Sequence, residues 1–186
     1  MFKGTRLAGM HRAALAGAVT VTLGAGAAVW GASAASAAPS GPPACTAADL
    51  AVWVNASESD GAAGTVGYPL EFTNISRNAC FVKGYPRVSA LGGKGQQLGS
   101  AAVRAPGSKA VRATIAAGGT AHAELLWADV TNYPAPTCKP ADTSLVRVYP
   151  PNQKGSDVGF ASLEACGAKG VIYLQITAIQ PGPNGD

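Results

Sequence analysis

Beyond residue 37 the sequence lacks most of the patterns by which enzymes are identified. His122 is the single histidine in this part, so a metal centre or a catalytic triad would need unusual partners. No serine lies in a G-x-S-x-G elbow, and Gly92-Gly93-Lys94-Gly95 lacks the Gly-Lys-Ser/Thr ending of a phosphate-binding loop. These absences argue against a hydrolase of the common serine or metal-dependent types and against a nucleotide-binding protein. We expect no catalytic residue, no metal and no cofactor.

The sequence also lacks a surplus of positive charge once its first 37 residues are set aside. The chain has 14 Lys and Arg against 10 Asp and Glu, and three of the basic residues are Lys3, Arg6 and Arg12. The 11 basic and 10 acidic residues that remain are scattered singly. This balance leaves no electrostatic footprint for nucleic acid or an anionic membrane. We therefore expect the partner to be a protein or a cell-wall component.

The first 37 residues have the organisation of an export signal. Three basic residues are followed by residues 13–30, which carry no charge, and then by the small residues Ala35-Ser36-Ala37. This order predicts a signal peptide over residues 1–37 and a secreted chain, free outside the cell or held in its envelope. A retained membrane anchor is the alternative for the leader. No later segment is long and apolar enough to span a bilayer.

Export makes the four cysteines informative, because thiols oxidise outside the cytoplasm. Four cysteines allow three pairings into two disulfides. We predict Cys45–Cys80 and Cys138–Cys166, since each bond joins an early loop to the next block of strands without crossing the other. In the chain-entropy model each bond would stabilise the fold by roughly 3–4 kcal/mol.

The rest of the chain shows the alternation of strands rather than the periodicity of helices. Val66, Tyr68, Leu70 and Phe72 alternate with smaller or polar residues, and Leu50, Val52 and Val54 do the same. Gly- and Pro-rich turns separate these segments from further runs at 79–83, 86–91, 97–103, 110–115, 120–127, 144–149 and 171–179. Seven to nine short strands predict an all-β fold, an immunoglobulin-like antiparallel β-sandwich, over residues 45–180.

The segments around this domain, and three within it, carry their own expectations. Residues 38–44 are predicted to be a disordered lead-in and residues 181–186 a flexible tail. The composition typical of a tail already begins at Gln180. Pro69 predicts an edge strand or a bulge, because proline cannot donate to a sheet ladder. Residues 171–179 predict a central strand covered on both faces. Residues 157–165 fit either period and remain a helical candidate.

His122 and Glu124 lie on one face of the strand predicted at 120–127. A hydrolase would use them as a base and its orienting carboxylate. The simpler interpretation is two exposed residues on the solvent face of a strand. We favour the simpler interpretation, because the pair matches no motif with a known structural context.

The loop that precedes Pro140 is the best candidate for contact with a partner. Segment 129–140 combines Tyr133, Lys139, several prolines and the anchoring Cys138. Stiff backbone and aromatic side chains favour binding, so Tyr133 and Lys139 are the predicted contact residues. A stiff connection between strands is the structural alternative. A protease inhibitor that presents Lys139 is another, although Pro140 argues against it.

Two stretches resemble a known family. Leu70-Glu71-Phe72-Thr73-Asn74 and the stretch from Cys80 through Gly84-Tyr85-Pro86 to Val88 resemble the L-x-F-T-N and C-x-L-x-G-Y-P-x-V signature of exported bacterial domains. The family is domain of unknown function 4232, common in actinobacteria, and the resemblance extends from Cys45 to about residue 179. It departs at Phe81-Val82, which concerns packing alone.

The resemblance implies an immunoglobulin-like sandwich and export, and it implies no activity. Together with the residues it predicts a non-catalytic domain that binds a partner in the cell envelope or outside the cell. A hydrolase using His122 and Glu124 and a secreted inhibitor presenting Lys139 remain the alternatives.

Overall fold

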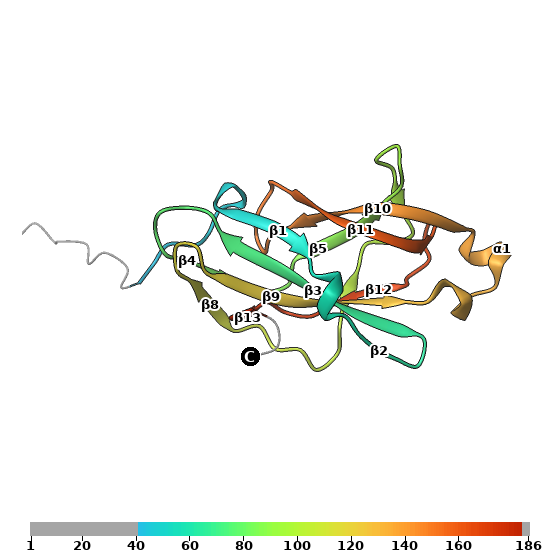
Figure 1. The fold of residues 1–186 in the computed structure, drawn as a ribbon, viewed down its shortest axis with the longest axis horizontal. Coiled ribbons are helices and arrows are strands. Elements are labelled where there is room, and N and C mark those ends of the chain that lie inside the picture. Colours follow the sequence, from blue (N-terminus) through green and yellow to red (C-terminus); the bar gives the residue numbers. More distant parts are fainter. Residues whose placement is uncertain (1–40, 184–186) are drawn as a thin grey trace, which may run out of the picture. The chain divides into compact units, whose positions relative to one another are not determined.

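The computed structural model describes residues 41–183, and the elements it contains are drawn in Figure 1. The predicted signal peptide, residues 38–40 of the lead-in and residues 184–186 of the tail lie outside the described part. Residues 41–183 contain thirteen strands: β1 Leu50–Val54, β2 Asp60–Ala62, β3 Thr65–Asn74, β4 Cys80–Lys83, β5 Arg87–Leu91, β6 Gln97–Leu98, β7 Val103–Arg104, β8 Arg112–Ile115, β9 Thr120–Ala128, β10 Pro140–Tyr149, β11 Asp157–Cys166, β12 Leu174–Ile176 and β13 Gln180–Pro181. The helices are single turns: η1 Ala47–Asp49, η2 Ala56–Glu58, η3 Val130–Asn132 and α1 Ala135–Cys138.

The strands form three sheets. The largest has the order β1-β3-β9-β12-β7, with β2 paired to β3 and β13 paired to β9. The second has the order β11-β10-β5-β6, and β4 pairs with β8 in a third. All of these strand pairs are antiparallel except β12 with β7. The prediction of a mostly β, antiparallel fold is confirmed.

The two larger sheets contribute to one hydrophobic core. In β9 every second residue is buried, which is the pattern of a strand with one covered face, whereas in β3 the residues from Pro69 to Phe72 are all buried. Leu70 and Phe72 from β3 and Leu125 from β9 are fully buried, and Val146 and Val148 come from β10 of the other sheet. The side chains on the opposite faces of these strands are therefore the ones available for contacts outside the core.

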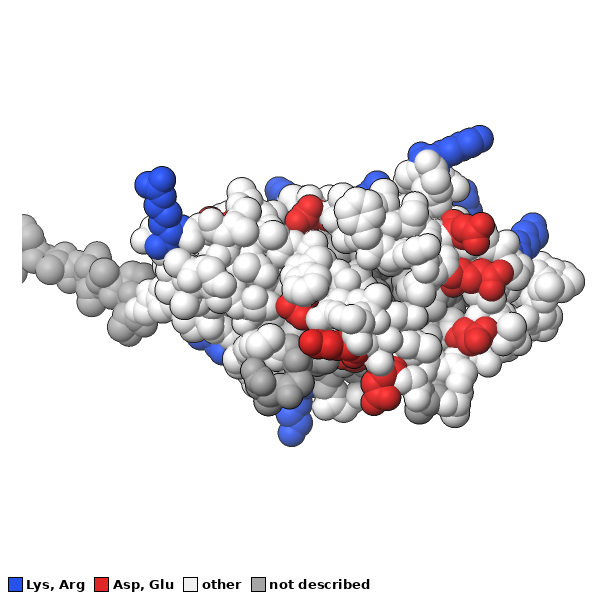
Figure 2. Space-filling view, in the orientation of Figure 1, with Lys and Arg blue, Asp and Glu red and all other residues white. Residues whose placement is uncertain are grey.

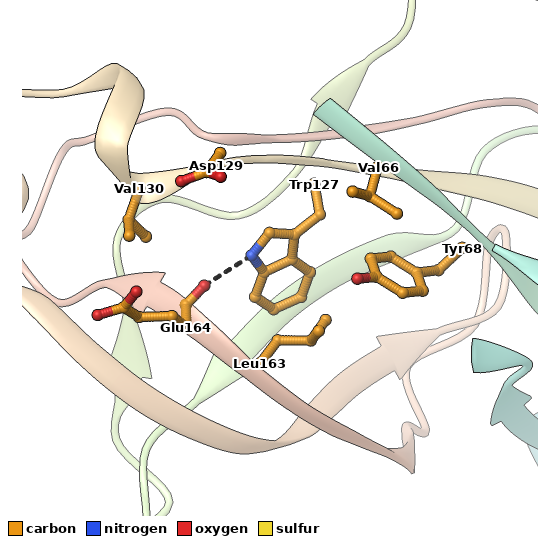
Figure 3. Close-up of a pocket in the computed structure, with 7 residues that line it drawn as sticks. All are labelled: Val66, Tyr68, Trp127, Asp129, Val130, Leu163 and Glu164. Carbon is orange, nitrogen blue, oxygen red and sulfur yellow. Dashed lines mark hydrogen bonds between the residues drawn. The ribbon is translucent and has the colours of Figure 1, made fainter. Parts of the chain in front are cut away.

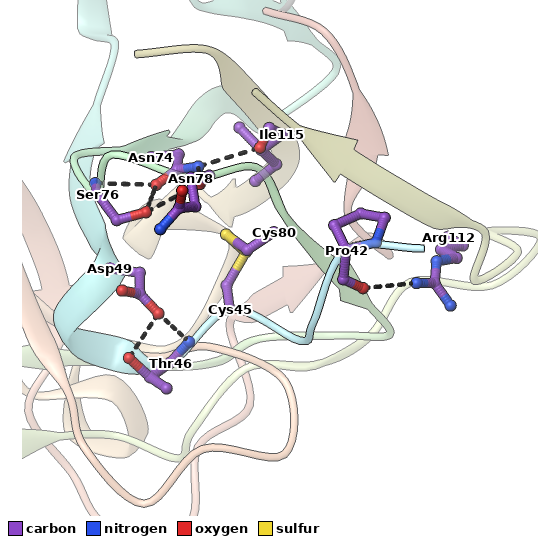
Figure 4. The surroundings of a disulfide bond; sticks show 10 residues. All are labelled: Pro42, Cys45, Thr46, Asp49, Asn74, Ser76, Asn78, Cys80, Arg112 and Ile115. Atoms are coloured by element: carbon purple, nitrogen blue, oxygen red, sulfur yellow. Dashed lines mark hydrogen bonds between the residues drawn. A yellow bond between two sulfur atoms is a disulfide. The ribbon is translucent and has the colours of Figure 1, made fainter. Parts of the chain in front are cut away.

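The structure contains both predicted disulfides. Cys45 is bonded to Cys80 at the start of β4, and Cys138 at the end of α1 is bonded to Cys166 at the end of β11. Figure 4 shows the first bond beside the η1 turn, where the Asp49 carboxylate accepts hydrogen bonds from the backbone N–H and the hydroxyl of Thr46, each at 2.7 Å. These bonds hold the pKa of Asp49 below its usual value.

The helical candidate at residues 157–165 is wrong, because this segment is strand β11. The segment misled the pattern because its outward positions are apolar. Val158 and Phe160 are exposed, whereas the inward positions are filled by small residues such as Gly159 and Ala161. An apolar residue on the solvent face removes the alternation that identifies a strand.

The expectation that Pro69 marks an edge strand is also wrong. Strand β3 lies between β1 and β9. The Pro69 carbonyl accepts a 2.8 Å hydrogen bond from Asn55 N–H, one residue after β1 ends at Val54. The backbone N and C=O of a strand residue point to the same side, so the missing N–H faces the place where β1 has ended. Proline therefore costs only the bond that the Asn55 carbonyl would accept, one residue beyond the end of β1.

Three further boundaries differ from expectation. Segment 171–179 is a strand only over β12, which lies between β9 and β7. In the predicted lead-in, Ala44 forms a bridge with Phe81, so residues beside it are held against β4. Gln180 and Pro181 pair with β9 as β13, so a part of the predicted tail is strand. In both terminal segments backbone hydrogen bonding to a neighbouring strand replaces the disorder that their composition suggested.

Candidate functional site

The most exposed large apolar side chains on the strands lie where β1 and β11 run beside each other. Phe160 is 82% exposed, and Trp53 and Val158 are each 46% exposed. A Cβ atom built on Gly159 would lie 3.6 Å from the Trp53 Cα, so β11 packs against the β1 backbone between Val158 and Phe160. We call Trp53, Val158 and Phe160 the seam surface.

Local sequence explains why these side chains point outward. In β1 the two neighbours of Trp53, Val52 and Val54, face the core, and Val52 is buried. Trp53 therefore faces outward. In β11 the inward residues Gly159 and Ala161 are small, which lets the strand approach β1 closely and leaves Phe160 on the opposite face. The Asp157 carboxylate accepts a 3.1 Å hydrogen bond from Val52 N–H and ties the two strands together.

Two acidic residues neighbour the seam surface along the strands, Glu71 beside Trp53 and Asp157 before Val158. Figure 2 shows Asp and Glu side chains spread across the visible face, whereas Lys and Arg project from its margins. Glu71 on β3 is paired directly with Trp53, is only 5% exposed, and accepts a 3.1 Å hydrogen bond from Asn55 Nδ2. On its other side Glu71 is paired with His122 of β9. The result is a row across the sheet of an indole, a carboxylate and an imidazole.

His122 and Glu124 share the outward face of β9, as the alternation predicted, but both are half-buried rather than exposed. His122 Nδ1 lies 2.9 Å from the Gly182 carbonyl oxygen. The Glu124 carboxylate fills the space above Gly67, where a Cβ atom would collide with it. Burial raises the pKa of Glu124, Asp60 raises it further, and His122 opposes both.

A hollow of about 220 Å³ adjoins Glu124 and is lined by Asp60, Gly61, Thr65, Gly67, Glu124 and Leu126. A raised pKa shifts a carboxyl toward the protonated form that a general acid uses. In the described residues no group of three or more His, Cys, Asp and Glu is arranged to hold a metal ion. The same residues contain no helix with the length and hydropathy for crossing a membrane.

A second cavity, of about 170 Å³, lies beside Trp127 and is shown in Figure 3. Two of its polar groups, the Trp127 indole and the Asp129 carboxylate, have structural partners. The indole N–H of Trp127 donates to the backbone carbonyl of Glu164 at 2.8 Å. The Asp129 carboxylate accepts from both the backbone N–H and the hydroxyl of Thr131, which lowers the pKa of Asp129. The indole hydrogen bond therefore connects the two sheets, and both the Trp127 indole and the Asp129 carboxylate serve the fold.

Tyr133 and Lys139 are brought to one end of the fold by η3, α1 and the second disulfide. Tyr133 is half-buried against the core, and its hydroxyl donates a 2.9 Å hydrogen bond to the Ile172 carbonyl. Lys139 is exposed, and its backbone is left-handed with φ at 52°. A substrate-like loop is read in the extended conformation, so this backbone does not favour the inhibitor alternative. Contact of Tyr133 and Lys139 with a partner stays a prediction.

The model of one protein family, described as Domain of unknown function (DUF4232), matches residues 45–180. The chain belongs to this family. No curated protein and no solved structure gives a significant match to the chain.

The signature residues of the DUF4232 domain have structural roles. Asn74, the last residue of L-x-F-T-N, is fully buried. Its Nδ2 donates to the carbonyls of Asn78 at 2.8 Å and Ile115 at 3.0 Å, and its Oδ1 accepts from the backbone N–H and the hydroxyl of Ser76 (Figure 4). One amide thus ties the turn after β3 to β8. The sequence carried this signal only as part of the family motif.

Gly84-Tyr85-Pro86 in the DUF4232 domain forms the link between β4 and β5. Gly84 has φ at 123°, a conformation that glycine adopts without steric cost. The Tyr85 hydroxyl donates to the Ser108 carbonyl, and Pro86 is buried directly before β5. These contacts hold the link as a turn against the segment that carries Ser108.

The seam surface is the part of the DUF4232 domain that sequence reasoning missed. Trp53 alternates with core residues, and Phe160 lies in the segment that was considered helical. The available signal was an outward-facing aromatic in each of two neighbouring strands. It becomes visible only when β1 and β11 are known to lie side by side.

Proposed function

We propose that this DUF4232 domain is an exported, non-catalytic binding module with an immunoglobulin-like β-sandwich fold, acting in the envelope or surroundings of an actinobacterium. The observation that carries the proposal is the seam surface, where Trp53 and Phe160 are exposed on neighbouring strands of a scaffold fixed by two disulfides. Exposed clusters of large apolar side chains on a stable fold are typical of interaction sites.

The sandwich assignment is supported by the way the sheets share their core. Inward residues of β3 and β9 in one sheet and of β5 and β10 in the other belong to one cluster of buried side chains. Two antiparallel sheets that bury their facing sides against each other form a sandwich. Proposed export is supported by the leader sequence and by the two disulfides, which persist in oxidising surroundings.

A binding role without catalysis is supported by how the candidate catalytic groups are used. His122 contacts the Gly182 carbonyl, Glu124 lies over Gly67, and Asp129 caps η3. These contacts give each group a role in holding the fold. The hydrolase alternative would instead require His122 and Glu124 to act on a bound substrate.

Affinity capture tests the proposal. The oxidised protein is immobilised and exposed to the envelope fraction and the medium of the producing cell, with a His122→Ala variant in parallel. We expect a specific partner to be retained equally by both proteins. Failure of the unaltered protein to retain any partner would contradict the binding role. Hydrolysis that disappears in His122→Ala would establish the enzymatic alternative.

A further inference from the structure

We infer that the seam surface binds an arginine-bearing segment of a partner protein. The inference rests on the proposed binding function and adds to it a place and a ligand chemistry. Three independent features carry it: the two uncovered aromatic rings, the acidic residues beside them, and the closed backbone edge between the strands.

Three other partly exposed rings of the molecule are each covered by an arginine of the same chain. The Arg112 guanidinium lies 3.5 Å from the centre of the Phe81 ring, Arg87 lies 4.5 Å from that of Tyr149, and Arg104 lies 4.7 Å from that of Tyr85. Such stacking is favourable because the face of an aromatic ring carries negative charge.

In the described part of the chain no lysine or arginine lies over Trp53 or Phe160. These two rings are also among the most exposed large apolar side chains, at 46% and 82%. Each therefore offers a free face to a cation supplied by another molecule. Exposed stacking of this kind contributes about 0.5–1 kcal/mol per ring, so both rings together have a measurable effect on affinity.

The charges beside the rings favour a cation over an anion. Glu71, which is 5% exposed, is paired with Trp53 across the strands, and Asp157 precedes the exposed Val158. Both carboxylates accept hydrogen bonds within the fold, so they favour a cation through their charge. Glu164 is a further exposed carboxylate on β11, beyond a bulge from Phe160 and at the cavity beside Trp127. A guanidinium can stack on a ring and donate to a carboxylate at the same time, which a compact ammonium does less well.

One basic residue opposes the inferred ligand. Arg147 on β10 is paired with Val158, at the border of the seam surface. Its charge would repel an incoming arginine, so its removal should strengthen binding. A substitution that only disturbed packing would weaken binding, so stronger binding in the Arg147 variant would point to charge.

The backbone edge suggests recognition by side chains. The Asp157 carboxylate already accepts from Val52 N–H, and β11 lies against β1. A partner strand that added to the β1 edge would have to displace both. The ligand is therefore expected to meet the rings and carboxylates through its side chains rather than to extend the sheet.

The test is a titration of the oxidised full chain with a fluorescent synthetic peptide of alternating arginine and glycine. Parallel titrations use the matched lysine and glutamate peptides and an N-acetylglucosamine oligosaccharide, since sugars also stack on exposed aromatic rings. We expect preference for the arginine peptide and weaker binding at about 500 mM salt than at about 20 mM, because salt screens exposed charges. Preference for the glutamate peptide or the oligosaccharide, or no binding of the arginine peptide, would overturn the inference.

Variants locate the binding surface. Phe160→Ala and Trp53→Ala should each weaken binding of the arginine peptide by about fivefold, in line with loss of one exposed stacking contact. Arg147→Ala should strengthen it. Ile75→Ala is the matched control, because Ile75 is 64% exposed and lies in the turn after β3, and it should leave binding unchanged.

Because Phe160 is so exposed, we expect Phe160→Ala to fold normally. The test therefore remains valid if Trp53→Ala is unstable. Unchanged binding in Phe160→Ala would overturn the inference. If the unaltered protein captures a cellular partner but does not bind the arginine peptide, the inference fails while the binding function stands. If it captures no partner, the binding function itself fails.

Discussion

The indole N–H of Trp127 donates a 2.8 Å hydrogen bond to the backbone carbonyl of Glu164 and thereby joins β9 of one sheet to β11 of the other (Figure 3). Trp127 is 4% exposed, so the carbonyl would lose its partner if the indole were removed. Trp127→Phe should lower the free energy of unfolding by about 2–3 kcal/mol, because it leaves a buried acceptor and a small cavity. Urea denaturation measures the change.

Tyr173→Phe is the matched control for the loss of this bond. The Tyr173 ring meets Trp127 edge-on at 5.6 Å between ring centres, but its hydroxyl makes only a 3.4 Å hydrogen bond to the Leu98 carbonyl. Its removal should therefore cost clearly less. An effect of Trp127→Phe no larger than that of Tyr173→Phe would contradict the linking role of the indole.

The two disulfides should each stabilise the fold by a similar amount. They span 35 and 28 residues, for which the chain-entropy model gives about 4 kcal/mol each. Replacing Cys45 and Cys80 together by alanine, or Cys138 and Cys166 together, should lower the free energy of unfolding accordingly. Denaturation of the two double variants under non-reducing conditions tests this. Losses below about 1 kcal/mol would show that the chain-entropy account does not apply.

Asn74 should be among the least replaceable residues of the domain. Its side chain satisfies four backbone and side-chain hydrogen-bonding groups around one turn, using both its donor and its acceptor ends. Asn74→Ala leaves these groups without their partner and should destabilise the fold by about 3 kcal/mol or more. Thermal unfolding measures the loss.

Asn74→Asp keeps the size of the side chain and separates its two roles. A carboxylate can still accept from Ser76, but it cannot donate to the carbonyls of Asn78 and Ile115. This variant should therefore also be unstable at neutral pH. Stability close to that of the unaltered protein would show that the donor end of Asn74 contributes little.

Glu124 should make the stability of the domain depend on pH. Burial raises the pKa of Glu124, so the fold favours the protonated carboxyl and loses stability as the pH rises through that pKa. Glu124→Gln removes the ionisation and should raise the unfolding temperature at about pH 7, and the gain should vanish at about pH 3.5. A gain of equal size at both pH values would point to packing instead.

Two variants complete the test of Glu124. Glu58→Gln removes an exposed carboxyl and should change the unfolding temperature little at either pH. Gly67→Ala should push the Glu124 carboxylate out toward water, because the new methyl group takes its place. The pKa of Glu124, followed by NMR titration, should then fall toward its ordinary value. A pKa that stays raised would mean that Gly67 does not create the burial.

Sequence predicted those parts of the fold that depend on one local property, such as the alternation of apolar residues along a strand. The alternation of Leu70 and Phe72 with outward residues identified β3, and the spacing of the cysteines was consistent with uncrossed disulfides. Pro69 was misjudged because its effect depends on where the neighbouring strand ends, which no local pattern contains.

The candidate site was hidden for a related reason. Val158 and Phe160 are apolar residues on a solvent-facing side of a strand, so they removed the alternation that would have identified β11. The alternation of apolar and polar residues is lost in this way where a surface contacts a partner instead of water. That Trp53 lies beside them follows from the contact of two strands about 100 residues apart, which only the tertiary structure gives.

Chemical-shift mapping by NMR tests the central claim most directly, because it reports every contact site at once. The isotope-labelled oxidised protein is titrated with the arginine–glycine peptide, and the indole N–H of Trp53 and the backbone N–H signals of β1 and β11 are followed. The account predicts that the largest shifts fall on Trp53 and on the residues around Phe160, with little change at Tyr133 and Lys139. Shifts confined to segment 129–140, or spread evenly over the described surface, would contradict it.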